Sequence, residues 1–259
     1  MGEKKGLMAG SKRSQWVLVV LLITLLALPG VVRAAMWVGG ELGGNFPRDM
    51  HGINLDTRYG TQTGGRLGVN PAVIGGVIIG YDFVNSGFGA YSWPEWMKYF
   101  SIATDLTFNR FDVKNQGIEF RRYSTFLPGS AKAKGYMVAW TFMVMAHYGF
   151  FPDSEVPTGR VNPYIGVGPA ILFSGFDLSS LGVGSATSTN IALVTELGVR
   201  FMALTNVSLD VSLRYRYANP SYEYTDSNGS LTGIPGSTTN LTMDAISQFS
   251  FLCRANYHF

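Results

Sequence analysis

Charge is scarce in this 259-residue chain, and so are cysteine and histidine. Charged residues make up 14% of the sequence, against about 25% in an average soluble domain. Disordered chains carry high charge and few aromatic residues, so an aromatic content of 14% excludes that class. One cysteine excludes an internal disulfide framework and a cysteine-rich zinc site, and three histidines leave little material for a metal cluster. Beyond the N-terminus, no run of about 20 apolar residues could span a bilayer as a helix.

The residues that are abundant suit a membrane protein. Apolar residues reach 46% of the chain, and there are 32 glycines. A membrane protein without spanning helices has one other solution, the closed β-barrel.

The first 34 residues have the pattern of a secretory signal peptide. Four basic residues precede an apolar stretch at 16–28, and Val32 and Ala34 occupy the −3 and −1 positions of a cleavage site. We therefore predict a signal peptide at 1–34 and a mature barrel domain at 35–259. A membrane anchor is the alternative, although about 13 apolar residues are short for a span. Removing 1–34 leaves 15 basic and 16 acidic residues, so no nucleic-acid partner is expected.

The mature chain contains eight segments in which apolar residues alternate with polar or small ones. They lie at 36–46, 73–83, 100–109, 136–148, 165–173, 191–201, 207–217 and 248–259. Strict alternation predicts strands with two different faces. A soluble sandwich would alternate in the same way, with its apolar side inward.

Three features favour the inverted arrangement of a membrane barrel. The apolar face of several segments ends in an aromatic residue, as expected of interfacial girdles; these residues are Phe46, Phe83, Phe108, Tyr148, Phe173, Tyr217 and Phe259. The opposite face carries Gly39, Gly43, Gly80, Gly166, Gly168 and Gly198, as a narrow lumen requires. Several segments run for about 11 residues or more, which suits a tilted membrane crossing. The sequence therefore predicts an all-β fold, an eight-stranded antiparallel transmembrane β-barrel of the outer-membrane type.

The links between the segments alternate in length. Four long polar links lie at 47–66, 110–135, 174–190 and 218–241, and we expect them outside the cell, where such barrels have their longer loops. The link Leu204–Asn206 is very short, as periplasmic turns are. The links 84–98 and 149–162 are longer than expected for the periplasmic side, but neither has enough alternating residues for two further strands.

These segments resemble the small outer-membrane β-barrel family, the eight-stranded OmpA/OmpX-like type. The motifs that carry the resemblance are GVIIGY at 76–81, PYIGVG at 163–168, LDVSLRYRY at 209–217 and YHF at 257–259. The resemblance implies export to the outer membrane of a Gram-negative bacterium, contact with its lipids and insertion by the barrel-assembly machinery. Phe251, Tyr257 and Phe259 match the terminal signal that this machinery reads.

Charged residues of both signs fall on the predicted lumen face, so they can pair and close the path. A three-residue loop at Leu204–Asn206, with Asn206 in the left-handed conformation, would place Ala203 opposite Val207. That register predicts two lumen ion pairs, Glu196 with Arg214 and Arg200 with Asp210, and the closing seam can pair Glu41 with Arg254. The remaining lumen charges are Asp82, Asp105 and Arg216. The alternative is that water or other lumen charges satisfy these groups separately.

No combination of residues indicates catalysis. A lipid-modifying barrel needs a nucleophile and a base near its external end, whereas His147 and His258 end strands at the periplasmic rim and His51 lies in a loop. We expect no enzyme activity, and no catalytic, cofactor-binding or metal-binding residue.

The sequence favours a structural or interaction scaffold that acts through its external loops. A narrow pore for ions or small solutes is the first alternative, although a selective pore more often carries charges of one sign. An outer-leaflet lipid-modifying enzyme is the second. Aromatic residues in the loops either contact an extracellular partner or settle on the barrel rim; they are Tyr59, Phe120, Tyr123, Tyr222 and Tyr224.

Overall fold

The computed structural model describes residues 36–49, 53–57, 60–64, 68–83, 93–113, 116–117, 121–122, 125–126, 130–131, 134–177, 185–226, 235–242 and 246–259. The predicted signal peptide lies outside the described residues, as do His51, Tyr59, Phe120 and Tyr123.

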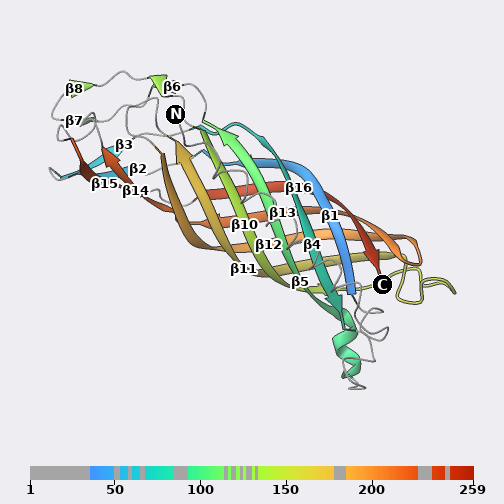
Figure 1. The fold of residues 1–259 in the computed structure, drawn as a ribbon. Coiled ribbons are helices and arrows are strands. Elements are labelled where there is room, and N and C mark those ends of the chain that lie inside the picture. The colour runs from blue at the N-terminus through green and yellow to red at the C-terminus, as the bar shows by residue number, and fades with distance from the viewer. Residues whose placement is uncertain are drawn as a thin grey trace, which may run out of the picture.

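Eight antiparallel strands form a closed barrel, which confirms the predicted fold (Figure 1). Around the barrel the strands follow the order β1 (Met36–Pro47), β16 (Ile246–His258), β13 (Val207–Ala218), β12 (Ser185–Leu204), β11 (Val161–Asp177), β10 (Lys134–His147), β5 (Phe100–Asp112) and β4 (Ala72–Asp82). The last strand pairs with the first, so the sheet has no free edge. Among the described residues, no helix is long and apolar enough to cross a bilayer.

Each strand turns its apolar face outward and its polar or small face inward. On β1, Leu42 is 63% exposed while the adjacent Glu41 is 5% exposed. On β13, Leu213 is 58% exposed while Arg214 is 1% exposed. This is the inverse of a soluble protein, and it is the arrangement of a barrel whose outer surface lies in lipid.

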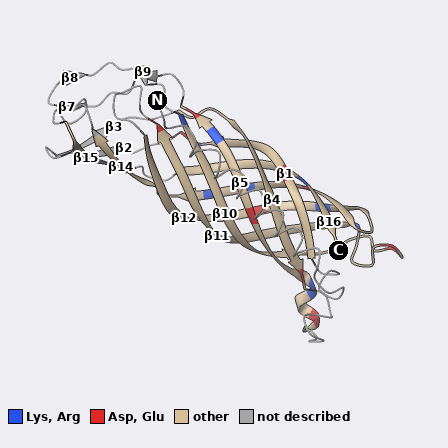
Figure 2. Cartoon of the chain, in the orientation of Figure 1, with Lys and Arg blue, Asp and Glu red and all other residues tan. Residues whose placement is uncertain are grey.

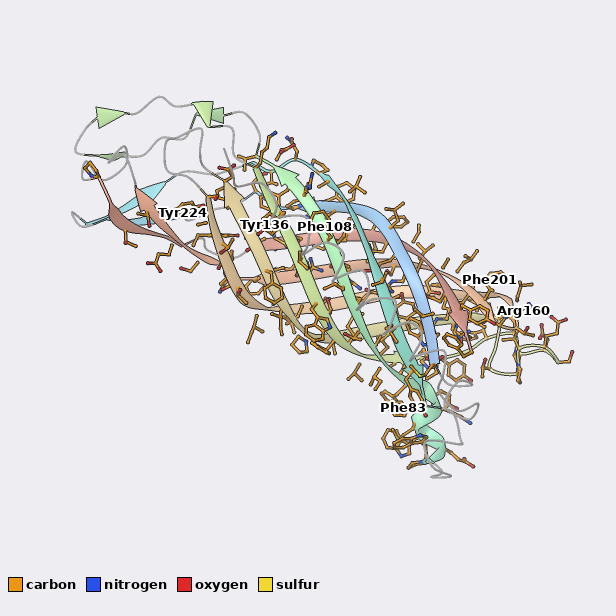
Figure 3. The ribbon with its side chains drawn as sticks, viewed as in Figure 1. Phe83, Phe108, Tyr136, Arg160, Phe201 and Tyr224 are labelled. Carbon is orange, nitrogen blue, oxygen red and sulfur yellow. The ribbon has the colours of Figure 1, made fainter. Side chains whose placement is uncertain are left out.

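Aromatic side chains mark both ends of this outer surface (Figure 3). Phe108 and Tyr136 lie toward the end with the long connections, whereas Phe83 and Phe201 lie toward the end with the short β12–β13 turn. Outer-membrane barrels have long extracellular loops and short periplasmic turns, and we therefore name the first end extracellular and the second periplasmic.

Lumen-facing glycines allow neighbouring strands to approach closely. A Cβ on Gly43 would lie 1.8 Å from the carbonyl oxygen of Phe251 on β16, and one on Gly168 would lie 1.8 Å from that of Phe142 on β10. No side chain fits at these distances. Backbone packing therefore requires glycine at both positions.

The long extracellular links contain strands, which corrects their prediction as plain loops. The hairpins β2 (Ile53–Thr57)–β3 (Gly60–Gly64) and β14 (Ser221–Asp226)–β15 (Ser237–Thr242) join in one sheet of order β14-β15-β2-β3. The link at 110–135 contains the two-residue strands β6 (Gln116–Gly117), β7 (Arg121–Arg122), β8 (Thr125–Phe126) and β9 (Ser130–Ala131). In addition, β11 and β12 extend into the link predicted at 174–190. The strands β2, β3, β6, β7, β8, β9, β14 and β15 have two to six residues and are mostly polar, so they give no strong hydrophobic periodicity.

The β12–β13 turn also differs from its prediction. Leu204, not Ala203, pairs with Val207, and a bulge at Ala203 restores the pairing of Met202 with Ser208. Phe151 is the sole non-glycine residue with positive φ in the described part of the chain, so Asn206 is not left-handed. A bulge inserts the extra residue into the strand, which leaves a two-residue turn, Thr205–Asn206, while the register beyond Met202 is the expected one.

The two longer periplasmic links add no transmembrane strand in their described parts. Residues Glu95–Tyr99 form a 3-10 helix, η2, and the Tyr99 ring stacks on that of Tyr148 with centroids 5.6 Å apart. In the other link, Asp153 accepts a 2.7 Å hydrogen bond from the Val156 backbone N–H and contacts Arg160. These hydrogen bonds lower the pKa of Asp153.

Candidate functional site

Five charged side chains from five strands meet in the middle of the lumen. We call them the central network: Glu41 on β1, Asp105 on β5, Glu196 on β12, Arg214 on β13 and Arg254 on β16. Arg214 Nε lies 2.7 Å from Glu196 Oε2, and Arg254 Nε lies 2.6 Å from Glu41 Oε2. All five residues are at most 5% exposed. Strand alternation turns them inward. Charged residues take up a small part of the barrel ribbon, most of which consists of other residue types (Figure 2).

The central network also crosses the lumen, through contacts that pairing between neighbouring strands does not predict. Arg214 Nη2 lies 2.6 Å from Asp105 Oδ2, although β13 and β5 stand on opposite walls of the barrel. Arg254 Nη2 donates a 2.8 Å hydrogen bond to Glu196 Oε2, and the Tyr164 hydroxyl donates a 2.9 Å bond to Glu196 Oε1. The two guanidinium groups thus connect walls that share no backbone hydrogen bond.

A second cluster lies nearer the periplasmic end. Arg200 lies 3.4 Å from a carboxylate oxygen of Asp82 and 3.4 Å from one of Asp210. Its guanidinium carbon also lies 4.4 Å from the centroid of the Trp37 ring, as in a cation–π contact. The Trp37 indole N–H donates to Asp82 over 3.0 Å, and the Ser101 hydroxyl donates over 2.7 Å. Asp82, predicted simply as a further lumen charge, is therefore a partner of Arg200.

Arg216 is the lumen charge that has no carboxylate partner among the described residues. It lies on β13 two residues beyond Arg214, toward the extracellular end, and it is buried. Its Nη2 donates to the Thr107 hydroxyl over 3.2 Å, its Nη1 lies 3.9 Å from the Met137 sulfur, and its Nε has no hydrogen-bond partner in the described part of the chain. Within the described residues no carboxylate lies within 4.0 Å of this guanidinium, so it is held by weaker contacts than Arg214 or Arg254.

Aromatic side chains fill the extracellular end of the lumen. We call Phe111, Phe176, Tyr222 and Tyr224 the aromatic cluster; its rings have centroids 6.2 Å apart for Phe111–Phe176 and 6.0 Å for Phe176–Tyr222. The Tyr222 hydroxyl donates to the Ser174 hydroxyl over 2.8 Å, and that of Tyr224 donates to the Phe176 carbonyl over 3.3 Å. Burial raises the pKa of both tyrosines.

The burial of Tyr222 and Tyr224 decides between their two predicted roles: both pack on the barrel and do not face an extracellular partner. Both residues are fully covered, because β14 turns this side of the hairpin toward the barrel. The β14–β15 hairpin is held to the barrel by these two side chains, so their role is packing.

One histidine contact resembles part of a catalytic arrangement. His258 Nε2 lies 3.0 Å from the Ser208 hydroxyl, and that hydroxyl lies 3.3 Å from Asp210. The carboxylate therefore contacts the serine and does not orient the imidazole, as the third member of a catalytic triad does. Ser208 is also fully buried. In the described parts, no group of three or more His, Cys, Asp or Glu side chains is arranged to hold a metal ion.

The three residues of the predicted assembly signal lie at the end of the chain, on or just after the closing strand. Phe251 and Tyr257 point outward from β16 and are exposed, and the Phe259 ring meets that of Tyr257 edge-on with centroids 5.4 Å apart. Their outward position gives them contact with lipid. Their role in assembly stays a prediction.

Comparisons with known proteins agree with this geometry at the level of the fold. No family model matches the chain, and no curated protein matches it significantly in sequence. Among solved structures, the outer membrane protein OprG from Pseudomonas aeruginosa superposes with a TM-score of 0.58 at 14% identity, over 88% of this chain and 97% of that chain. Neisserial surface protein A superposes with a TM-score of 0.43 at 16% identity, over 86% of this chain and 97% of that chain. The attachment invasion locus protein Ail of Yersinia pestis superposes with a TM-score of 0.39 at 12% identity, over 87% of this chain and 99% of that chain.

The barrel topology and the superposition on OprG define the fold. The chain has the fold of the small, eight-stranded outer-membrane β-barrels. At identities this low the likeness shows the fold alone, so function must be argued from the lumen and the loops.

Proposed function

We propose that this protein is a closed outer-membrane scaffold, which binds an extracellular partner through the sheet formed by β2, β3, β14 and β15. The proposal of a closed lumen is supported by one observation, the central network, in which Arg214 connects the opposite walls β13 and β5. Eight strands enclose an interior that side chains can just fill, so a network across the middle leaves no continuous path for solute.

The binding role rests on the position of the extracellular sheet. The sheet stands beyond the barrel on a rigid scaffold, which is where barrels and other rigid folds carry binding residues (Figure 1). Tyr222 and Tyr224 hold the β14–β15 hairpin to the barrel from beneath. A sheet anchored in this way presents a fixed surface to the outside of the cell.

Planar-bilayer recording tests the closed lumen. The wild-type barrel should show no stable conductance steps, and neither should a variant in which residues 221–242 are replaced by a short Gly-Ser link. A variant that combines this replacement with alanine at Glu41, Glu196, Arg214 and Arg254 should conduct. Stable ion-selective steps in the wild type would instead establish the narrow pore.

Photo-crosslinking on intact cells tests the binding role. A photoreactive residue at the exposed Thr238 of β15 should give a discrete protein adduct, whereas the same residue at the exposed periplasmic Glu155 should not. If both positions give the same products, or neither gives any, the extracellular sheet has no specific partner under those conditions and the scaffold proposal fails.

A further inference from the structure

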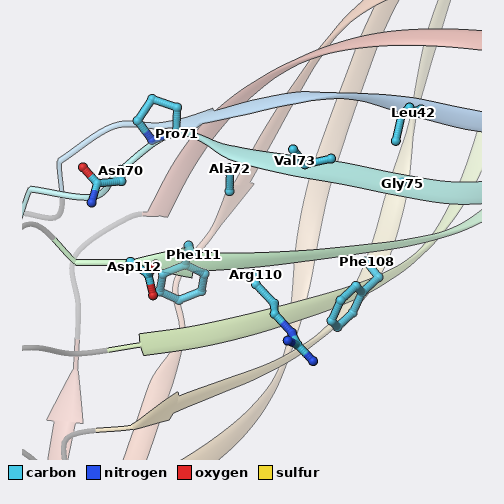
Figure 4. A pocket seen from close by; sticks show the side chains of 10 residues that line it. All are labelled: Leu42, Asn70, Pro71, Ala72, Val73, Gly75, Phe108, Arg110, Phe111 and Asp112. Carbon is cyan, nitrogen blue, oxygen red and sulfur yellow. The ribbon is translucent and has the colours of Figure 1, made fainter.

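A groove of about 600 Å³ opens on the outer wall of the barrel where β1, β4 and β5 run together (Figure 4). Leu42, Val73, Gly75 and Phe108 form its apolar part, and Arg110 stands at its extracellular end. Val73 is 70% exposed, and Leu42 and Phe108 are exposed as well. The groove therefore lies on the surface that the barrel turns toward lipid.

The groove exists because Gly75 has no side chain. The outward neighbours of Gly75 on the same strand, Val73 and Val77, are both apolar and exposed. Barrel packing does not require glycine here, since an added Cβ would meet only the Glu41 carbonyl oxygen and Leu42 Cδ1, each at an ordinary 3.6 Å. This contrasts with Gly43, where a Cβ would collide with the neighbouring strand. The absence of a side chain at 75 thus shapes the outer surface without serving the barrel interior.

Arg110 places a positive charge at the level where lipid headgroups begin. It is the next outward residue of β5 after Phe108, which belongs to the extracellular aromatic girdle, and its guanidinium lies 5.8 Å from the centroid of that ring. Its cross-strand neighbour Tyr136 is a further girdle residue. In the described part of the chain, no carboxylate lies within 4.0 Å of Arg110. Asp112, further out on β5, also lines the groove and stands opposite Lys134 in the strand pair.

We propose that the groove binds a phosphorylated lipid of the outer leaflet, with an acyl chain over Gly75 and the headgroup phosphate on Arg110. The apolar floor matches the chain, and the guanidinium can form charge-assisted, bidentate hydrogen bonds with a phosphate. The groove opens sideways into the bilayer, so the membrane itself supplies the ligand. The role of the site is to hold one lipid at a fixed place on the barrel wall.

Native mass spectrometry of the barrel purified from outer membranes tests this site. Bis-phosphorylated lipid A is the probe, and the fraction of protein that retains one lipid is measured. Arg110→Gln should weaken retention about tenfold, as expected for the loss of charge-assisted hydrogen bonds, whereas Lys134→Gln, outside the groove, should not. Gly75→Leu should weaken retention by filling the groove. The matched control is Gly40→Leu, because Gly40 is also outward-facing, with no atom within 4 Å of an added Cβ, but does not line the groove.

Further arms separate the lipid from simpler explanations. Dephosphorylated lipid A should be retained weakly by all variants, and inorganic phosphate alone should not bind. Equal retention by Arg110→Gln and Lys134→Gln overturns the phosphate contact, and equal retention by Gly75→Leu and Gly40→Leu overturns the groove. Heat-modified gel migration checks that each variant is folded; should Gly75→Leu fail to fold, the Arg110 and Lys134 pair still decides the proposal.

Discussion

Removing Arg214 should destabilise the barrel far more than removing the charge of Glu196. Arg214 is the ionic partner of Asp105 in the described structure, so Arg214→Met leaves that buried carboxylate without a guanidinium. An uncompensated buried charge costs about 3–5 kcal/mol. Glu196→Gln, by contrast, leaves Arg214 with Asp105 and Arg254 with Glu41. The cost there is limited to weakened hydrogen bonds, about 1–2 kcal/mol.

A second substitution should reverse part of the first. Asp105→Leu removes the carboxylate that Arg214→Met leaves alone, and leucine fills a similar volume. Replacing a buried ion pair by apolar residues is often neutral or stabilising. The double variant should therefore be more stable than Arg214→Met alone, by at least about 1–2 kcal/mol on the same reasoning.

Equilibrium urea unfolding of the barrel in phosphatidylcholine vesicles, followed by tryptophan fluorescence, gives these free energies. The order of stability should be wild type, Glu196→Gln, the double variant and then Arg214→Met. Equal costs for the two single variants would show that Asp105 does not depend on Arg214. A double variant less stable than Arg214→Met would show that the carboxylate is satisfied in another way, and the account of the central network would be wrong.

Other expectations concern the membrane face, assembly, export and pH. Leu213→Arg should cost roughly 2–4 kcal/mol in the same unfolding assay because it places a charge in lipid, whereas Ser212→Arg on the lumen face should cost less; equal costs would mean that the faces are reversed. Deleting Phe259 should lower the membrane yield and leave export intact, and a normal yield would contradict its place in the assembly signal. Mass spectrometry of the outer-membrane protein should find an N-terminus at Ala35. Because burial raises the pKa of Tyr222, the stabilisation from its protonated hydroxyl is complete below about pH 10 and is lost as the pH rises further; tyrosinate absorbance should show late ionisation that is smaller in Tyr222→Phe, where Tyr224 still ionises late.

The membrane-spanning part could be predicted from sequence because its information is local. Side chains on a strand alternate between the two faces with a period of two. The sequence of each strand therefore predicts which residues face the lumen. A short connection between β12 and β13 then fixes the register, and Glu196 faces Arg214 even though the turn itself has a bulge at Ala203. The wrong prediction of the turn does not change the register of the strands, because the bulge that holds the extra residue lies next to the turn.

The cross-lumen contacts could not be predicted in the same way. Asp105 meets Arg214 from the opposite wall, and such a contact depends on the diameter and stagger of the closed barrel. The alternation of side chains predicts that both residues point into the lumen. It does not predict where each one lies along the barrel axis, and so it does not predict that they meet. The extracellular sheet is harder still, since β2 pairs with β15 from the far end of the sequence.

The central network and the aromatic cluster both fill the lumen, but the first is ionic and the second is aromatic. We therefore expect different conditions to disrupt them. Screening by salt weakens exposed charges, but the central network is buried, so ionic strength alone should not open it. The aromatic cluster depends instead on the position of β14, because Tyr222 and Tyr224 reach back from the hairpin to β11. A partner that pulled on the extracellular sheet would disturb the aromatic cluster first and leave the central network in place. Under the proposed function, the sheet can therefore bind its partner while the central network keeps the lumen closed.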